Sequence, residues 1–174
     1  MSLARASLIV ALASVSTFTM SACADDQPAN QTTMTHASGT VHDMVTTVNG
    51  LAPVGTPSVL QQSVKEVDET AHGVRHLVYR EVRAAGTRSP IHVHPSGGIT
   101  CIISGEMTLF LEGLSPRVAR SGDCYWMPPN TPMYGFSSGS TDATFFDSFD
   151  LSPGEEEWDV VEVGQEGLND NFGH

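Results

Sequence analysis

The segment that decides the fold is Gly86–Glu106, which runs G-T-R-S-P-I-H-V-H-P-S-G-G-I-T-C-I-I-S-G-E. It places His92 and His94 on either side of Val93, in a stretch typical of β structure. Side chains alternate between the two faces of a strand, so both imidazoles point to the same side. Two imidazoles on one face, with apolar neighbours, predict half of a metal site.

The chain around this segment has the texture of a β protein. From Val59 onward, short runs rich in Val, Ile, Phe, Tyr and Thr alternate with Gly, Pro, Ser and Asp, as in strands joined by turns. The expected strands are Leu60–Val67, His76–Ala84, Ile91–His94, Ile99–Ile103, Glu106–Glu112, Arg117–Arg120, Cys124–Met127, Met133–Ser137, Ala143–Leu151 and Trp158–Val163. No long run has the 3.6-residue period of an amphipathic helix. The pattern predicts an all-β fold, an antiparallel sandwich or barrel.

A second segment that begins with glycine follows the first along the chain. It is Gly122–Met133, G-D-C-Y-W-M-P-P-N-T-P-M, and sixteen residues separate Gly105 from Gly122. Together the two segments resemble the two motifs of the cupin superfamily. The first motif has a glycine, His-x-His, a glutamate and a glycine; the second has a glycine, a proline, a glycine and a histidine. The resemblance covers about residues 59 to 163 and implies a cupin-like antiparallel β-barrel of the jelly-roll type.

The resemblance implies four metal-ligand positions, of which this sequence keeps two. His92 and His94 match the family's histidine pair. Gly98 stands where the family has its glutamate, and Met133 stands where it has the histidine of the second motif. Asn130 replaces the glycine of the second motif, and asparagine also adopts positive φ at modest cost.

Three interpretations of the histidine pair stay open. In the first, His92, His94 and Met133 bind one transition metal; a thioether favours copper, with iron, nickel and zinc as the other choices. Further donors to that metal would be Tyr125, His72 or His76. In the second, the pocket is metal-free and the histidines are hydrogen-bonding or acid–base groups that face an organic ligand. In the third, they only fill the mouth of the barrel.

The pocket around the histidines is expected to include Gly98, Tyr125 and Arg88. Glycine in place of glutamate would leave space beside His94 for a ligand group or a water, although a tight turn explains it equally well. Arg88 can bind a carboxylate substrate, and a surface ion pair is its alternative role. The predicted function is a small-molecule or metal pocket of undetermined activity. The alternative implied by the resemblance is a metal-dependent dioxygenase, isomerase or lyase for a small organic substrate.

The N-terminus is typical of an exported protein. Arg5 precedes the apolar run Leu8–Val15, which is followed by small residues and is too short to span a bilayer. Residues 1–22 are therefore expected to be a signal peptide. Met20-Ser21-Ala22-Cys23 resembles the lipobox of bacterial lipoproteins, so acylation of Cys23 would anchor the chain to a membrane in the periplasm or cell envelope. Cleavage after Ala24 would instead release a soluble protein.

The rest of the chain divides by composition. Residues 23–56 are expected to be a flexible linker, because no aromatic residue occurs between Phe18 and Tyr79. Residues 57–163 form the barrel domain and 164–174 a polar tail. The formal charge of −12 argues against a nucleic-acid partner. The run Val74–Val82 could be an edge strand through which two copies form a homodimer.

Two cysteines remain once Cys23 is set aside. Cys101 and Cys124 both lie in predicted strands. Two free buried thiols are the expected state, and a disulfide is the alternative in an oxidising compartment.

The lipid anchor has a direct test. Cys23→Ser removes the acylation site, so the variant is expected to leave the membrane fraction and appear in the soluble fraction. Immunoblotting of fractionated cells measures the distribution. A variant that still sediments with the membranes would refute acylation at Cys23.

Overall fold

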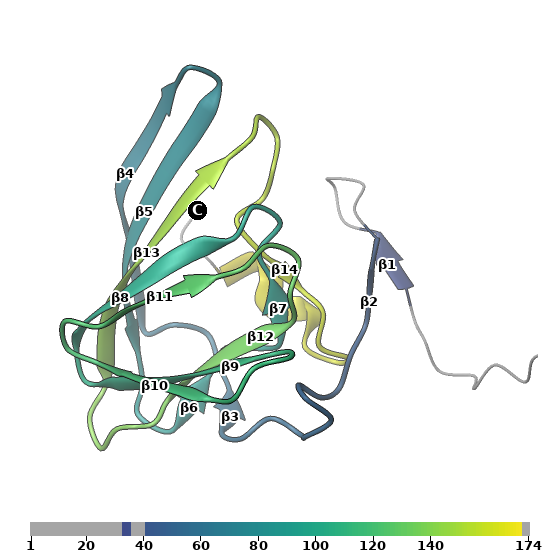
Figure 1. Cartoon of the computed structure of the whole chain (residues 1–174), viewed down its shortest axis with the longest axis vertical. Coiled ribbons are helices and arrows are strands. Elements are labelled where there is room, and N and C mark those ends of the chain that lie inside the picture. The colour runs from purple at the N-terminus through teal and green to yellow at the C-terminus, as the bar shows by residue number, and fades with distance from the viewer. Residues whose placement is uncertain (1–32, 36–40, 172–174) are drawn as a thin grey trace, which may run out of the picture. The chain divides into compact units, whose positions relative to one another are not determined.

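The computed structural model describes residues 33–35 and 41–171 (Figure 1). The predicted signal peptide, the lipobox with Cys23 and the first part of the predicted linker lie outside these residues. Over the part of the chain that is described, no helix has both the length and the apolar character needed to cross a membrane.

Two sheets form the body of the fold (Figure 1). The first has the order β11 (Cys124–Met127), β8 (Gly98–Ser104), β13 (Ala143–Leu151), β5 (Val74–Arg83) and β4 (Gln62–Ala71). The second has the order β10 (Arg117–Arg120), β9 (Glu106–Leu111), β12 (Met133–Ser137), β6 (Thr87–Arg88) and β3 (Thr56–Pro57), and β7 (His92–Val93) joins β12 to β14 (Asp159–Val160). All these pairs are antiparallel except β3 with β6. The predicted all-β, antiparallel fold is confirmed.

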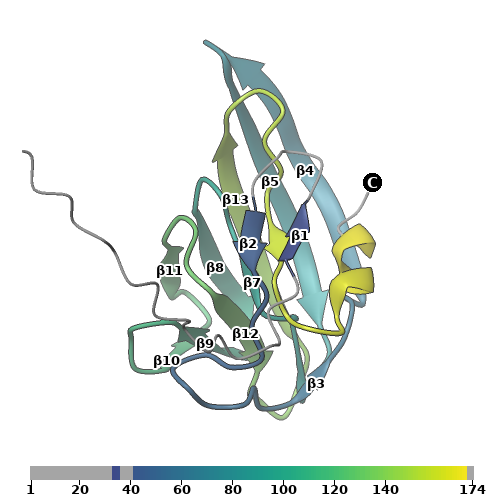
Figure 2. The ribbon, with the colours of Figure 1, turned by 90° about the vertical axis from the view of Figure 1, so that its right-hand side faces the viewer.

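The remaining elements are short. β1 (Thr33–Thr35) pairs with β2 (Val41–Asp43), and a 3-10 helix, η1, covers Glu166–Asn171 in the predicted polar tail. The β4–β5 hairpin extends beyond the neighbouring strands in both views of the ribbon (Figures 1 and 2).

The core lies between the two sheets because the strands alternate as period 2 requires. In β13, Phe145 and Phe149 are buried, whereas Phe146 between them is partly exposed. Phe145 and Phe149 pack in one cluster with residues of both sheets, among them Leu77, Tyr79, Ile102, Met107, Leu109 and Met133. The alternation that predicted the strands therefore also selects the face that each one buries.

Most predicted strands are present with nearly the predicted bounds. Two are much shorter than predicted, since only His92–Val93 and Asp159–Val160 make strand pairs. The expectation that Val74–Val82 is a free edge is wrong, because β5 is paired on both sides, with β4 and with β13. The edge strand on this side of the sheet is β4, which the hairpin turn at His72–Gly73 folds back along β5.

Residues 41–56 are part of the fold, so the predicted linker is too long at its C-terminal end. Met44 and Val48 are buried, and Val45 bridges to Glu162. The Asn49 side chain donates to the carbonyls of Leu111 and Leu114 and accepts from the amide of Gly113. A few buried aliphatic side chains and the amide of Asn49 hold the segment in place. The prediction of a linker rested on the lack of aromatic residues, which does not reveal these contacts.

Cys101 and Cys124 form a disulfide, so the expectation of two free thiols is wrong. They are directly opposed in the β8–β11 register, with their Cα atoms 4.1 Å apart. The bond ties the edge strand β11 to the sheet. Thr100 and Ile102 on either side of Cys101 are buried, so alternation places the disulfide on the outer face.

Arg88 forms a buried ion pair with Glu162 instead of facing the pocket. Its Nη1 and Nη2 atoms donate to the two carboxylate oxygens at 2.6 and 2.7 Å. Glu162 Oε2 also accepts the amide hydrogen of Ile91, at 2.8 Å. The pair therefore fixes the C-terminal segment to the residue that precedes His92.

Removing one partner of this pair is expected to be costly. Glu162→Ala leaves the Arg88 guanidinium buried without a carboxylate, so the free energy of unfolding should fall by about 3–5 kcal/mol. The matched control is Glu66→Ala, which breaks the exposed ion pair with Arg80 and should cost less than about 1 kcal/mol. Urea denaturation measures both, and equal losses in the two variants would contradict the structural role of Glu162.

Candidate functional site

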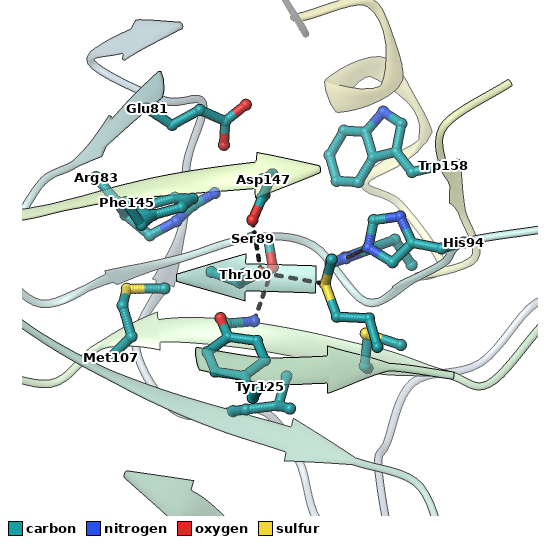
Figure 3. A pocket seen from close by; sticks show the side chains of 15 residues that line it. Glu81, Arg83, Ser89, His94, Thr100, Met107, Tyr125, Phe145, Asp147 and Trp158 are labelled. Atoms are coloured by element: carbon teal, nitrogen blue, oxygen red, sulfur yellow. Dashed lines mark hydrogen bonds between the residues drawn. The ribbon is translucent and has the colours of Figure 1, made fainter. Parts of the chain in front are cut away.

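A small cavity lies between the sheets and has two chemically different ends (Figure 3). His94 and Trp158 lie at one end, with His92 next to His94, and Arg83 lies at the other end, with Glu81 and Asp147 on the Arg83 side of Trp158. Thr100, Tyr125, Met127 and Met133 are among the residues that line the same cavity. Its volume is about 30 Å³, room for a few water molecules or a ligand of a few atoms.

The histidine end is fixed by two backbone carbonyls. The Nδ1 atom of His92 lies 2.8 Å from the carbonyl oxygen of Pro90. The Nδ1 atom of His94 lies 2.7 Å from the carbonyl oxygen of Glu157. A carbonyl oxygen only accepts, so each Nδ1 must carry a hydrogen and donate it. Both Nε2 atoms are then the free nitrogens of neutral imidazoles.

The two free nitrogens face each other, with 3.1 Å between the Nε2 atoms of His92 and His94. Burial lowers the pKa of His92 well below its usual value, and the neighbouring His94 lowers it further. Burial also lowers the pKa of His94, to about 4. Neither ring therefore carries an extra proton near neutral pH, and two lone pairs point at one small volume. That arrangement favours a cation between them.

The surroundings hold both rings in place. The indole of Trp158 packs edge-on against His92, with ring centres 4.8 Å apart, and the ring of Phe149 lies 5.1 Å from His94. The carbonyl oxygen of His94 accepts the amide hydrogen of Asn130, whose φ of +51° is in the left-handed region. The asparagine that replaces the second motif's glycine thus adopts the positive φ that the sequence predicts, and it joins the two motifs.

Gly98 does not leave open space beside His94, so that expectation is wrong. A Cβ atom at position 98 would lie 2.7 Å from two ring carbons of Phe149 and 2.9 Å from Met127 Cε. The aromatic ring therefore occupies the volume that a glutamate side chain would need. The tight turn offered as the alternative falls on the preceding residue, Gly97, whose φ is +74°.

The other predicted donors divide into residues at the cavity and residues away from it. Met133 is fully buried, pairs with His92 between β12 and β7, and lines the cavity, as Tyr125 does. His72 is in the β4–β5 turn, and His76 is exposed with its Nδ1 atom 2.7 Å from Asp150. Within residues 33–35 and 41–171, no third His, Cys, Asp or Glu joins the histidine pair.

The charged end of the cavity was missed in the sequence. Glu81, Arg83 and Asp147 are at most 7% exposed, and Thr100 donates a 2.5 Å hydrogen bond to Asp147. Burial, together with the Asp147 charge, raises the pKa of Glu81 well above its usual value. Burial raises the pKa of Asp147 to about 6. The signal was present, because Glu81 and Arg83 share the phase of the buried Leu77 and Tyr79 along β5.

The comparisons with known proteins concern the barrel. No family model and no curated protein matches the chain. Solved structures similar to it include a cupin family protein with a double-stranded β-helix fold from Methanocaldococcus jannaschii, at 27% identity and a TM-score of 0.45 over 53% of this chain and 84% of that one. A cupin-like protein from Thermotoga maritima has 20% identity and a TM-score of 0.44 over 53% and 75% of the two chains.

Enzymes are also among the similar solved structures. A DMSP lyase from Ruegeria pomeroyi is 20% identical, with a TM-score of 0.49 over 57% of this chain and 51% of that one. Others are proteins described only by their fold, such as a double-stranded β-helix protein from Klebsiella pneumoniae with 17% identity and a TM-score of 0.45 over 62% and 90% of the two chains. The double-stranded β-helix named in these descriptions is the cupin-type fold that the two sequence motifs predict.

The packing around Gly98 yields a test. Gly98→Ala should lower the free energy of unfolding by about 1–3 kcal/mol, because the added methyl group overlaps the Phe149 ring. Gly167→Ala is the matched control, since a Cβ atom there meets no heavy atom within 4 Å. Thermal and urea unfolding of both variants measure the effect. Wild-type stability in Gly98→Ala would show that position 98 is open after all.

Proposed function

We propose that the barrel binds one late transition-metal ion through the Nε2 atoms of His92 and His94. The observation that carries the proposal is the pair of carbonyl hydrogen bonds at Nδ1, which leaves two neutral nitrogens 3.1 Å apart. Nitrogens bound to one metal ion at about 2.0–2.1 Å lie about 3 Å apart when they occupy neighbouring positions. The spacing of the pair therefore suits chelation without movement of either ring.

The complete ligand set of the cupin resemblance does not fit, whereas a smaller set does. Gly98 supplies no carboxylate, and Phe149 fills the space for one. The sulfur of Met133 is the candidate third ligand, since that residue lines the cavity beside its strand partner His92. Two neutral imidazoles with a thioether favour copper over iron or nickel, and zinc is the other ion that suits imidazole.

The protein's own residues would set the chemistry of such a centre. A bound ion supplies Lewis-acid polarisation of a small ligand in the cavity. Trp158 and Phe149 hold the two imidazoles and exclude water on their outer sides. Glu81 and Asp147, with their raised pKa values, add groups that can hold or move a proton in the same cavity. The second candidate function is therefore an enzyme that acts on a small molecule. The two carboxyl groups favour that function over a storage protein.

We also propose that the protein is located outside the cytoplasm. Export rests on the predicted signal peptide and on the lipobox at Cys23. The Cys101–Cys124 disulfide supports it, because such bonds are stable in oxidising compartments and rare in the cytosol.

Titration of metal-free protein with copper and with zinc tests the metal site. The expected result is one ion per chain and a rise in melting temperature, since an ion at 100 times its dissociation constant stabilises by about 2.7 kcal/mol. The His92→Ala, His94→Ala double variant should lose both effects. His76→Ala removes an exposed histidine outside the cavity and should change neither effect.

The pH dependence separates this site from ordinary surface histidines. Because the pKa of His94 lies near 4, protons compete with the metal only in strongly acidic solution. Binding should therefore persist at pH 5.5 and be lost as the pH falls through about 4. A melting temperature that does not change when copper, zinc, iron or nickel is added at neutral pH would overturn the proposal.

A further inference from the structure

Arg83 is a buried cation at the end of the cavity remote from the histidines (Figure 3). It is 4% exposed, and its Nη1 atom donates to the carbonyl oxygen of Ser58 at 3.1 Å. Among the described residues, no carboxylate oxygen forms an ion pair with it inside 4 Å. Arg88, by contrast, holds Glu162 through two hydrogen bonds. A buried guanidinium without a direct counter-ion is costly unless something else supplies the negative charge.

Two neighbouring groups are hydrogen-bond donors into the same cavity. Burial and the Asp147 charge raise the pKa of Glu81 well above its usual value, which favours the protonated carboxyl, and its buried Oε2 atom has no hydrogen-bond partner within the described part of the chain. Ser89 accepts the amide hydrogen of Gly135 at its Oγ atom, so its own hydroxyl hydrogen is left to donate. Arg83, Glu81 and Ser89 therefore present donors to a ligand that accepts.

The charge of Asp147, which lines the same cavity, opposes an anion at this end. The titratable and charged groups that line the cavity with it are Glu81 and Arg83 on β5, Tyr125 on β11 and the two histidines of the β7 segment. Its charge balances that of Arg83 at neutral pH. Burial raises the pKa of Asp147 to about 6, so it takes up a proton under mildly acidic conditions. An incoming anion can then replace its charge as the counter-ion of Arg83.

We propose that this end of the cavity binds a small carboxylate, with Arg83 as its charge partner, Glu81 and Ser89 as donors, and one proton taken up by Asp147. The cavity of about 30 Å³ limits the ligand to the size of formate, acetate or glycolate. A cationic ligand would be repelled by Arg83, and a neutral ligand could not replace the charge that Asp147 loses when it takes up a proton. The inference extends the proposed function by naming a ligand class, and its carboxylate site stands without the metal.

Calorimetric titration of metal-free protein with formate, acetate and glycolate tests the site, with chloride as the control anion. Binding is expected for the carboxylates and to be about 20-fold tighter at pH 5.5 than at pH 7.5, because only the Asp147-protonated form accepts the ligand. Heats measured in two buffers of different ionisation enthalpy should show uptake of one proton at pH 7.5. Carboxylates that bind no better than chloride at either pH would overturn the proposal.

Variants separate the roles of the charged residues. Arg83→Gln should weaken binding at least tenfold, whereas Arg117→Gln, which removes an exposed arginine on β10, should leave it unchanged. Asp147→Asn should bind equally at both pH values with the tight affinity, a gain at pH 7.5 that a misfolded variant cannot give. Unchanged pH dependence in Asp147→Asn, or full binding in folded Arg83→Gln, would refute the assignment.

The two proposals fail in different ways. Protein that binds a metal at the histidines but no carboxylate refutes only the anion site. Protein that binds carboxylate in the absence of any metal response refutes only the metal site. Measuring both on one preparation therefore distinguishes the outcomes.

Discussion

The site depends on two hydrogen bonds between imidazole N–H groups and backbone carbonyl oxygens. One carbonyl, of Pro90, is local; the other, of Glu157, arrives from the far end of the chain. The second exists only because β14 returns to pair with β7 and the ion pair of Glu162 closes the same contact. Folding of the C-terminal segment onto the barrel therefore sets which nitrogen of each histidine is free. Without that contact, either tautomer of His94 would be accessible.

The cavity combines a neutral end and a charged end inside one low-dielectric space. At the first, burial keeps two imidazoles uncharged, and at the second, Arg83 is charged near two carboxyl groups whose pKa values burial raises. The two ends interact, since the charge of Arg83 contributes to the lowered pKa of His92. An ion placed at either end therefore alters the affinity of the other, and a cation at the histidines with an anion at Arg83 is the mutually favourable combination.

The strands and the histidine pair could be predicted because both rest on local alternation. β3 and β6, with two residues each, are too short to show a period. The role of Gly98 could not be predicted, because its space is filled by Phe149 from another strand. For the same reason the sequence favoured Arg88, which is near the histidines along the chain, over Arg83, which the β5 register brings into the cavity. Contacts between strands that are distant in sequence can be predicted only when the alignment of the paired strands is known. Composition does not reveal that alignment.

The acceptor for His94 is the main chain of Glu157, and this has an evolutionary consequence. A peptide carbonyl is supplied by every amino acid, so the identity of residue 157 can drift without changing the imidazole. The length of the preceding turn, Ser152–Glu156, cannot drift in the same way, since one inserted or deleted residue would shift which carbonyl reaches Nδ1. Among homologous chains, selection for this hydrogen bond would conserve the length of the loop and not the residue at position 157. An alignment would show it as a loop without insertions or deletions.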